Sequence, residues 1–241
     1  MVSAIRFTGT GPGAHTQDGC SVELYRRMPA DGEAEIVAAV VRAGGSILEL
    51  GSGPGRVTHA LVALGYAVTA VDNSAEMLAH VRGAETVLAD IEDLDLDRRF
   101  DAVLLASTLI NFPEAETRAA LLAACRRHVR PGGAVLIERR NPDSFATLRP
   151  GPVGEEAGIR HVIESVRHEG RLVQATLRSE AADATWTQSF TQEVIDDAQM
   201  AAELAAAGLR LDRWLDPPRR WALAVPADRP QAGCAAACRA S

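Results

Sequence analysis

Five short apolar segments alternate with helical patterns between residues 46 and 138, and this rhythm constrains the fold more than any other feature. The apolar segments are residues 46–50, 67–71, 86–89, 100–107 and 134–138. The fourth, FDAVLLAS, is apolar through its centre, as a strand buried on both faces should be. Helical spacing fills residues 56–64, 73–82 and 114–129, with Ser74 as a plausible N-cap and Pro131-Gly132-Gly133 breaking the third helix. The alternation predicts a doubly wound α/β fold, with a parallel sheet, helices on both faces and right-handed crossovers.

This rhythm stops after Asn141. Residues 142–158, PDSFATLRPGPVGEEAG, are rich in Pro and Gly and are expected to form a loop. Residues 161–168 and 171–179 predict a hairpin, and the alternating stretch 185–191 adds a third antiparallel strand. A helix at 192–207 and strands at 209–215 and 221–225 then resume the first pattern.

Together these segments predict one domain with a mostly parallel seven-stranded sheet and an inserted antiparallel cap. The expected division is a core of residues 34–139 and 192–226, a cap of residues 140–191 and an N-terminal lid segment of residues 1–33. Residues 227–241 form an Ala-rich tail that we expect to be disordered.

Charge and composition exclude several classes of function. The formal net charge is −7, which argues against a phosphate backbone as the main partner and so against nucleic acid. No apolar run approaches the ~18 residues of a membrane span, and the N-terminus lacks a signal-peptide pattern, so a cytoplasmic protein is expected. The four cysteines are interpreted as free thiols rather than metal ligands: Cys20, Cys125, Cys234 and Cys238. Monomer and homodimer both stay open.

The stretch ILELGSGPGRV, residues 47–57, places three glycines directly after the first strand. Glycines there permit a tight turn and close approach of backbone to a ligand, at the edge where open α/β sheets bind ligands. A phosphate loop would need Gly-Lys-Ser/Thr, whereas Arg56 and Val57 follow Gly55. A dinucleotide fingerprint would need its third glycine at position 56, and the Glu49 carboxylate would repel a diphosphate.

The spacing ExGxGxG resembles motif I of the class I S-adenosylmethionine-dependent methyltransferases, which have a Rossmann-like fold. Further marks of that family follow in order: Asp72 ending the second strand, Asp90 ending the third, FDAVLLASTLIN along the fourth, and RPGG before the fifth. The resemblance implies S-adenosyl-L-methionine as cofactor and S-adenosyl-L-homocysteine as product. In it, Asp72 would accept hydrogen bonds from both ribose hydroxyls, and Asp90 would lie near adenine. Both also have simpler interpretations, as a helix cap and as part of an acidic loop.

The residues that the resemblance assigns to cofactor binding come from five segments. They are Tyr25, Glu49, Gly51, Ser52, Gly53, Asp72, Asn73, Met77, Asp90, Ile91, Ser107 and Thr108. Tyr25 lies in the N-terminal stretch DGCSVELYRR, where a tyrosine of small-molecule members folds over the cofactor near its methyl group; core packing is the alternative.

The acceptor is predicted by exclusion. DNA amino-methyltransferases of this fold resemble one another in an Asn/Asp-Pro-Pro-aromatic motif after strand four, where this chain reads STLINFP, so a nucleobase is not expected. No metal-ligand set is evident, so no metal is proposed. A small molecule, such as a natural product or other metabolite, remains as the expected acceptor, with oxygen, nitrogen and carbon all open.

Catalytic and acceptor-binding roles fall on a few residues near the expected cap. Tyr25 and Glu138 are the catalytic candidates, and Asn111, His161 and Trp186 are the candidates for acceptor binding, with His168 as a further possible base. A histidine in a cap strand is more often a surface residue, and Trp186 could instead pack the cap. Two alternative functions stay open: an aminopropyl transferase of the same fold and a non-catalytic cofactor-binding scaffold.

Overall fold

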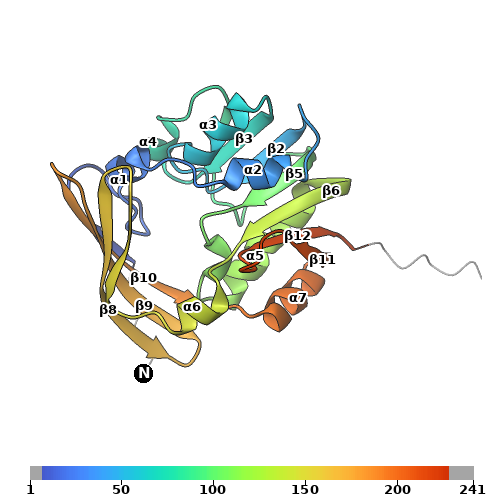
Figure 1. Cartoon of the computed structure of the whole chain (residues 1–241). Coiled ribbons are helices and arrows are strands. Elements are labelled where there is room, and N and C mark those ends of the chain that lie inside the picture. The colour runs from blue at the N-terminus through green and yellow to red at the C-terminus, as the bar shows by residue number, and fades with distance from the viewer. Residues whose placement is uncertain (1–6, 228–241) are drawn as a thin grey trace, which may run out of the picture.

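The core of the molecule is a seven-stranded sheet in the order β11-β12-β6-β5-β2-β3-β4 (Figure 1). The computed structural model describes residues 7–227. The core strands are β2 (Ser46–Leu50), β3 (Ala67–Asp72), β4 (Glu85–Leu88), β5 (Phe100–Leu105), β6 (Val129–Glu138), β11 (Leu209–Trp214) and β12 (Trp221–Pro226). Strands β2 to β6 pair in parallel, β12 pairs antiparallel with β6, and β11 pairs antiparallel with β12. The predicted mostly parallel seven-stranded sheet is confirmed.

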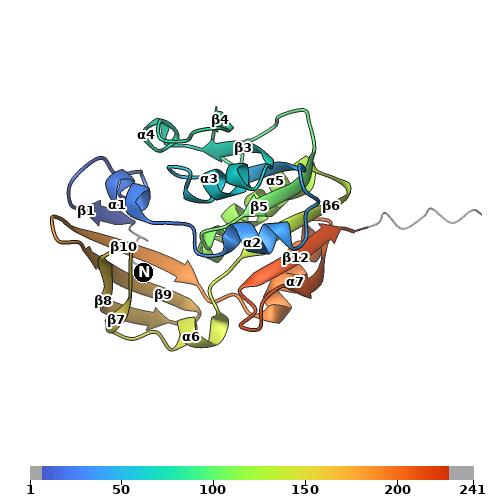
Figure 2. The same cartoon turned by 45° about the horizontal axis from the view of Figure 1, so that its top comes forward.

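Helices cover both faces of this sheet. The helices α2 (Glu33–Ala38) and α3 (Arg56–Ala63) lie over one face, as Figure 2 shows, and pack against Ile47 of β2. The helices α5 (Ala115–His128) and α7 (Asp197–Ala206) lie on the other face, in the apolar cluster that also contains Leu48. Neighbouring strand residues point to opposite faces, so a strand between two helix layers must be apolar throughout.

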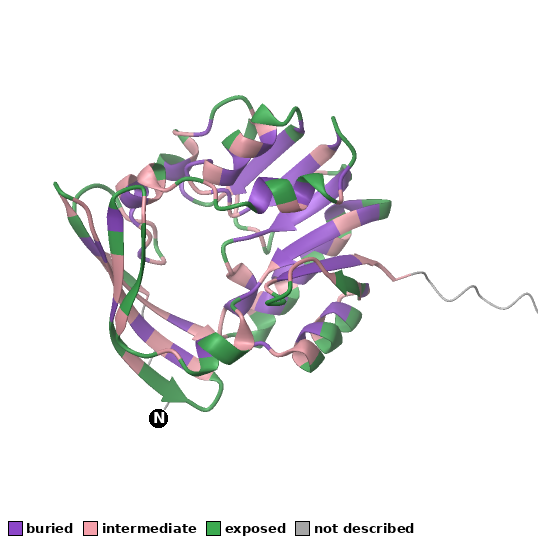
Figure 3. Ribbon diagram, viewed as in Figure 1, coloured by how far each residue is buried: buried purple, intermediate pink, exposed green. Residues whose placement is uncertain are grey.

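A second sheet of five antiparallel strands, in the order β1-β10-β9-β8-β7, forms the cap. Its strands are β1 (Thr8–Thr10), β7 (Gly151–Glu156), β8 (Ile159–Glu169), β9 (Leu172–Glu180) and β10 (Thr185–Glu193). The hairpin β8–β9 and the third strand β10 confirm the sequence prediction. Figure 3 shows buried residues along the core strands, while the cap strands mix buried, intermediate and exposed positions.

The N-terminal segment belongs to the cap rather than to the core sheet. Strand β1 pairs with β10, placing Thr8 opposite Ser189, and α1 (Val22–Arg27) follows it. Leu24 of α1 packs with Ile159 and Trp186 of the cap. The sequence predicts residues 1–33 as an N-terminal lid segment, and strand β1 was not among the predicted strands.

Several element boundaries differ from the prediction. The expected loop 142–158 contains α6 (Pro142–Ala146) and strand β7, because Asn141 caps the helix by accepting a hydrogen bond from Ser144 and β7 pairs with β8. The helix expected at 73–82 is the short α4 (Ala75–Leu78). The helix expected from 192 begins at 197, because β10 continues its pairing with β9 to Glu193.

Other expectations concern residues outside the described range or the membrane. The tail from residue 228, with Cys234 and Cys238, lies outside the described residues, as do residues 1–6 of the lid segment. Within residues 7–227, each helix is too short or too polar to cross a bilayer.

Candidate cofactor and acceptor site

The glycine loop turns sharply at the carboxyl end of β2. Gly51, Gly53 and Gly55 all have positive φ, of 71°, 55° and 92°, a region that side chains rarely allow. The amides of Gly51 and Ser52 both donate to the Val71 carbonyl at 2.9 Å, which folds the loop back against β3. A Cβ on Gly51 would lie 2.6 Å from a Leu109 methyl, whereas a Cβ on Gly53 would meet no heavy atom within 4 Å. The loop is therefore packed on one side and open at Gly53.

Asp72 fixes this loop from the end of β3. One carboxylate oxygen accepts from the Gly53 amide at 2.8 Å, and the other accepts from the Ser74 amide at 2.9 Å. Burial raises the pKa of Asp72, and these backbone hydrogen bonds oppose that effect. Each carboxylate oxygen has a second lone pair, so the side chain can still receive two hydroxyl donors. Capping and ligand binding are thus compatible, with Ser74 capping α4 through Met77.

Glu49 is buried beside the loop, with 3% of its surface exposed. Thr58 donates to its carboxylate at 2.5 Å. Burial raises the pKa of Glu49 to about 7, against the lowering influence of the Thr58 hydrogen bond and the Arg56 charge. A carboxyl group with this pKa can bind a proton or a cationic ligand near neutral pH.

Arg56, at the start of α3, joins the loop to the N-terminal segment. It pairs with the buried Glu33 at 2.5 Å and also donates to the Pro29 carbonyl at 3.2 Å. The second Glu33 oxygen accepts from the Asp31 amide at 2.5 Å. Sequence reasoning missed Glu33, because nothing in the sequence around residue 33 indicates its distant partner Arg56.

The remaining predicted cofactor residues surround the loop at the ends of β3 and β4. The Asn73 amide donates to the Asp90 carboxylate at 2.9 Å, and both residues are exposed. Ile91 lies 3.9 Å from the position of a Gly51 Cβ. Met77 is buried on α4.

The residues present fit the expected cofactor. The Ser52 hydroxyl oxygen is buried and has no hydrogen-bond partner among residues 7–227, although such groups are nearly always paired. It sits in the loop next to the open side of Gly53. A buried hydroxyl, an open glycine face and the Asp72 carboxylate at one strand end suit the polar part and the ribose of S-adenosylmethionine.

Strand β5 ends in a strained turn. Ser107 and Thr108 have φ of 55° and 59°, which for two consecutive residues with side chains is costly. The Ser107 amide donates to the Glu138 carboxylate at 2.8 Å, and Gln192 of β10 donates to the Thr108 hydroxyl at 3.1 Å. Burial raises the pKa of Glu138. Strained backbone of this kind persists where surrounding contacts hold it. Here the hydrogen bond from Gln192 to Thr108 also joins the cap to the core.

The N-terminal segment brings Tyr25 to the same region. Interaction with Cys20, followed by burial, raises the pKa of Tyr25 well above its usual range, and Arg140 acts in the opposite direction. Burial raises the pKa of Cys20 to about 12, so the thiol stays neutral at neutral pH. Gln188 of β10 donates to the Cys20 sulfur at 3.1 Å, and the thiol lies 3.5 Å from the Asp18 carboxylate. The Tyr25 hydroxyl therefore keeps its proton at neutral pH.

Two of the three acceptor-binding candidates, Trp186 and Asn111, are buried in the structure. Trp186 is 1% exposed, and its indole N–H donates to the Pro12 carbonyl at 3.0 Å, so no ring face is free for an acceptor. Asn111 is fully buried; its amide donates to the Glu193 carbonyl and accepts from the Arg140 amide, both at 2.8 Å. Trp186 links β10 to the N-terminal segment, and Asn111 links the core to the two ends of the cap.

The histidines differ from each other. His161 Nδ1 hydrogen-bonds Ser179 at 2.9 Å, while its Nε2 is buried without a partner among the described residues. Burial lowers the pKa of His161, which is therefore neutral at neutral pH. His168 is exposed on β8 and contacts the Leu148 carbonyl. His161 keeps its place as an acceptor-binding candidate.

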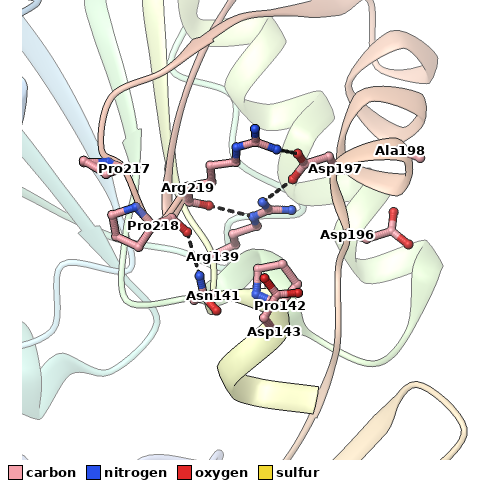
Figure 4. Close-up of a pocket in the computed structure, with 10 residues that line it drawn as sticks. All are labelled: Arg139, Asn141, Pro142, Asp143, Asp196, Asp197, Ala198, Pro217, Pro218 and Arg219. Carbon is pink, nitrogen blue, oxygen red and sulfur yellow. Dashed lines mark hydrogen bonds and ion pairs between the residues drawn. The ribbon is translucent and has the colours of Figure 1, made fainter. Parts of the chain in front are cut away.

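A separate pocket of about 570 Å³ lies beside the buried Arg139 (Figure 4). It is lined by Arg139, Asn141, Pro142, Asp143, Asp196, Asp197, Ala198, Pro217, Pro218 and Arg219. The Arg139 guanidinium donates hydrogen bonds to the Asp197 carboxylate and to the Ile195 and Arg219 carbonyls. None of the predicted site residues lines this pocket, so we do not assign it to the cofactor or the acceptor.

Comparison with known proteins agrees with this geometry. A family described as methyltransferase domain matches residues 47–133. The cypemycin N-terminal methyltransferase of Streptomyces sp. is 36% identical over 109 residues, which cover 42% of this chain and 44% of that enzyme. A ubiquinone biosynthesis O-methyltransferase of Xanthomonas oryzae pv. oryzae is 31% identical over 173 residues, covering 67% and 68% of the two chains.

The fold extends beyond these alignments. The structure of SAM-bound CalS10, an amino pentose methyltransferase from Micromonospora echinaspora, matches with a TM-score of 0.66 at 24% identity. That match covers 85% of this chain and 95% of the other. The glycine loop, the acids after β3 and β4, the strand order and the sequence relatives together place the chain in the class I S-adenosylmethionine-dependent methyltransferases.

Proposed function

We propose that the protein transfers a methyl group from S-adenosylmethionine to a nitrogen or oxygen atom of a small-molecule or peptide-like acceptor. The observation that carries this proposal is the glycine loop, which is fastened to Asp72, open at Gly53 and supplied with a free buried Ser52 hydroxyl. The names of the relatives support nitrogen and oxygen as target atoms, because they describe an N-terminal amine, an O-methylation and an amino sugar.

The cofactor roles follow from position in the loop and at the strand ends. Asp72 receives the two ribose hydroxyls on its remaining lone pairs, and Ser52 and the Gly53 backbone contact the polar end of the cofactor. Glu49 supplies negative charge next to the loop. Met77, Ile91 and the pair Asn73–Asp90 border the adenine.

The acceptor lies between the end of β5, the end of β6 and the N-terminal segment. Bound S-adenosylmethionine supplies a methyl group already activated on a sulfonium, so the protein contributes mainly proximity and alignment. The Glu138 carboxylate, held by the Ser107 amide, accepts a hydrogen bond or proton from the acceptor. The Tyr25 hydroxyl donates a hydrogen bond and, with α1 and the cap, limits access of water.

A matched pair of glycine variants tests the cofactor site. Gly53 and Gly44 have φ of 55° and 70°, and a Cβ on either meets no atom within 4 Å. Gly53→Val and Gly44→Val therefore introduce the same backbone strain into equally open space, but only Gly53 faces the cofactor. We expect calorimetry to show that Gly53→Val loses S-adenosylhomocysteine binding while Gly44→Val keeps it. Equal affinities in the two variants would remove the glycine loop from the site.

The same calorimetry separates the proposed methyl transfer from the alternatives. A methyltransferase should bind S-adenosylhomocysteine more tightly than decarboxylated S-adenosylmethionine, whereas an aminopropyl transferase should show the reverse order. Product masses from incubations with amine and hydroxyl acceptors then test catalysis, since each transfer adds one methyl group. Cofactor binding without any product across both acceptor classes would favour a scaffold.

A further inference from the structure

Two adjacent arginines follow β6 and have opposite surroundings. Arg139 is fully buried and pairs with Asp197 at 2.5 Å, on the side of α7. Arg140 is directed toward the cap, where its Nε donates to Gln192 Oε1 of β10 at 3.0 Å. Its backbone amide is fixed by the buried Asn111. The chain therefore holds Arg140 firmly at the junction of core and cap.

The Arg140 guanidinium lies between two aromatic rings. Its central carbon is 5.6 Å from the ring centroid of Phe145 in α6 and 5.6 Å from that of Phe190 in β10. Aromatic faces attract a guanidinium and also restrict its orientation. Two rings and the Gln192 amide thus position this group, which is unusual for an exposed arginine.

The outer nitrogens of Arg140 have no hydrogen-bond acceptor in the part of the chain that the structure describes. Within residues 7–227, Gln192 is the one side-chain acceptor of its guanidinium, and no carboxylate lies within ion-pair distance. The other arginines that reach the interior are paired: Arg56 with Glu33, Arg118 with Glu193 and Glu203, and Arg139 with Asp197. Arg140 differs from these three in having no carboxylate partner among the described residues.

Arg140 faces the proposed acceptor region. The alternate residues Gln188, Phe190 and Gln192 share one face of β10, and they contact Cys20, Arg140 and Thr108 respectively. Arg140 therefore lies between the N-terminal segment and the strained end of β5. Burial lowers its pKa, and Tyr25 and then Glu138 are the groups whose charge opposes that shift. Arg140 is nevertheless exposed to solvent.

We propose that Arg140 binds an oxyanion carried by the acceptor, a carboxylate or a phosphate, and thereby orients the acceptor for methyl transfer. The two outer nitrogens of a guanidinium match the two oxygens of such a group. With its anionic end at Arg140, the acceptor can present its nucleophilic atom to the region of Glu138 and Ser107. This role rests on the proposed function, because it assigns the other end of the same acceptor.

The test uses full-length protein saturated with S-adenosylhomocysteine and three probe anions: benzoate, inorganic phosphate and pyrophosphate. Arg140→Gln removes both the positive charge and the bidentate donor pair of the guanidinium, while Arg140→Lys keeps only the charge. Arg149→Gln is the matched control, because Arg149 is another exposed cap-side arginine with no ion pair among the described residues. Affinities for each probe are measured by NMR titration or calorimetry.

We expect the wild-type protein and Arg149→Gln to bind at least one probe with similar affinity. Arg140→Gln should weaken that binding by about tenfold or more. Arg140→Lys should weaken it by less, because the ammonium keeps the positive charge although it cannot reproduce the bidentate contact. A preference for benzoate would identify a carboxylate, and a preference for the phosphates would identify a phosphorylated acceptor. Equal probe affinities in Arg140→Gln and Arg149→Gln, or no probe binding by the wild type, would overturn the proposal.

The cofactor affinity separates this inference from the function on which it rests. S-adenosylhomocysteine should bind Arg140→Gln as it binds the wild type, which also shows that the variant is folded. If the wild type fails to bind S-adenosylhomocysteine, the proposed function is wrong. If it binds the cofactor but no anion at Arg140, only the acceptor assignment is wrong.

Discussion

At the scale of single residues, the site depends on carboxylates that have two tasks. Asp72 holds the glycine loop through Gly53 and would also receive the ribose. Glu138 holds the strained Ser107 amide and would also face the acceptor. Ligand binding and backbone geometry are thus coupled in the same side chains, so substitutions there should affect affinity more than the lost contact alone.

The first residue-scale prediction concerns Asp72. Asp72→Ala should weaken S-adenosylhomocysteine binding by about 2–4 kcal/mol, using about 1–2 kcal/mol for each charge-assisted hydrogen bond. Calorimetry measures this change. Glu116→Ala, which removes an exposed acid from α5, is the control for net charge and should leave the affinity unchanged. An unaltered affinity in folded Asp72→Ala would exclude the ribose role.

The second prediction concerns the charge of Glu49. Its pKa is raised from 4.5 to about 7 on folding, so the folded state binds this proton more tightly than the unfolded chain. Protonation of Glu49 therefore stabilises the folded state. This contribution to the free energy of unfolding is complete below about pH 4.5, is lost as the pH rises through about 7, and amounts to about 3 kcal/mol at most. Glu49→Gln cannot titrate, so its free energy of unfolding should increase relative to wild type between about pH 5 and pH 8.

Urea denaturation across this pH range measures the difference between the two proteins. The exposed Glu116→Gln should follow the wild-type curve, which shows that the effect belongs to burial and not to net charge. Parallel curves for wild type and Glu49→Gln would mean that Glu49 titrates normally.

At the scale of elements, the N-terminal segment is attached to the cap by a small apolar contact. Leu24, Ile159 and Trp186 form it, and Arg27 adds an ion pair with Asp183 and lies 5.1 Å from the Trp186 ring. Helix α1, which carries Tyr25, is too short to be stable alone. Its position over the site therefore depends on Trp186.

Replacing Trp186 should release this helix. Trp186→Ala removes a fully buried ring and should cost about 3–5 kcal/mol, with faster hydrogen exchange in residues 7–28. Trp186→Phe retains most of the ring volume and should retain slow exchange, losing chiefly the hydrogen bond to Pro12. In Trp186→Ala, acceptor turnover should fall more than cofactor affinity. Unchanged exchange in both variants would contradict this attachment.

The sequence predicted elements where local pattern decides structure and missed those that distant partners decide. The core strands follow from apolar runs between helical patterns, and the cofactor residues stay predictions based on their positions at strand ends. Strand β1 is the tripeptide TGT, which becomes a strand only by pairing with β10. The environment of Arg140 likewise combines Phe145, Phe190 and Gln192 from two elements, and no local spacing reveals it.

At the scale of the whole molecule, Asn111 joins the chain segments that enter and leave the cap. Its amide binds the Arg140 N–H on the way in and the Glu193 carbonyl on the way out. Nearby, Arg118 connects α5 with Glu193 and with Glu203 of α7. Core and cap are therefore connected at this joint through hydrogen bonds and ion pairs.

The joint can be tested with Asn111→Ala. The substitution leaves the Arg140 N–H and the Glu193 carbonyl, both in partly buried hydrogen bonds, without this partner, and should lower the free energy of unfolding by about 2 kcal/mol. Acceptor KM should rise, because the joint positions Arg140, while cofactor affinity should change little. Asn73→Ala, which removes an exposed amide with one contact, should cost less than about 0.5 kcal/mol. Similar losses in the free energy of unfolding for the two variants would contradict the role of Asn111 in stabilising the junction of core and cap.

The pairing of β1 with β10 also orders events during synthesis. Strands β2 to β6 and their helices are contiguous in sequence, so the core that carries the glycine loop can begin to form while the ribosome is still translating the cap. Strand β1 can pair only after Ser189 has been synthesised, and α1 can pack in its final position only after Trp186 has been synthesised. The nascent protein should therefore become competent to bind its cofactor before it can enclose an acceptor, and ribosome-bound chains that end before residue 185 should retain the first property alone.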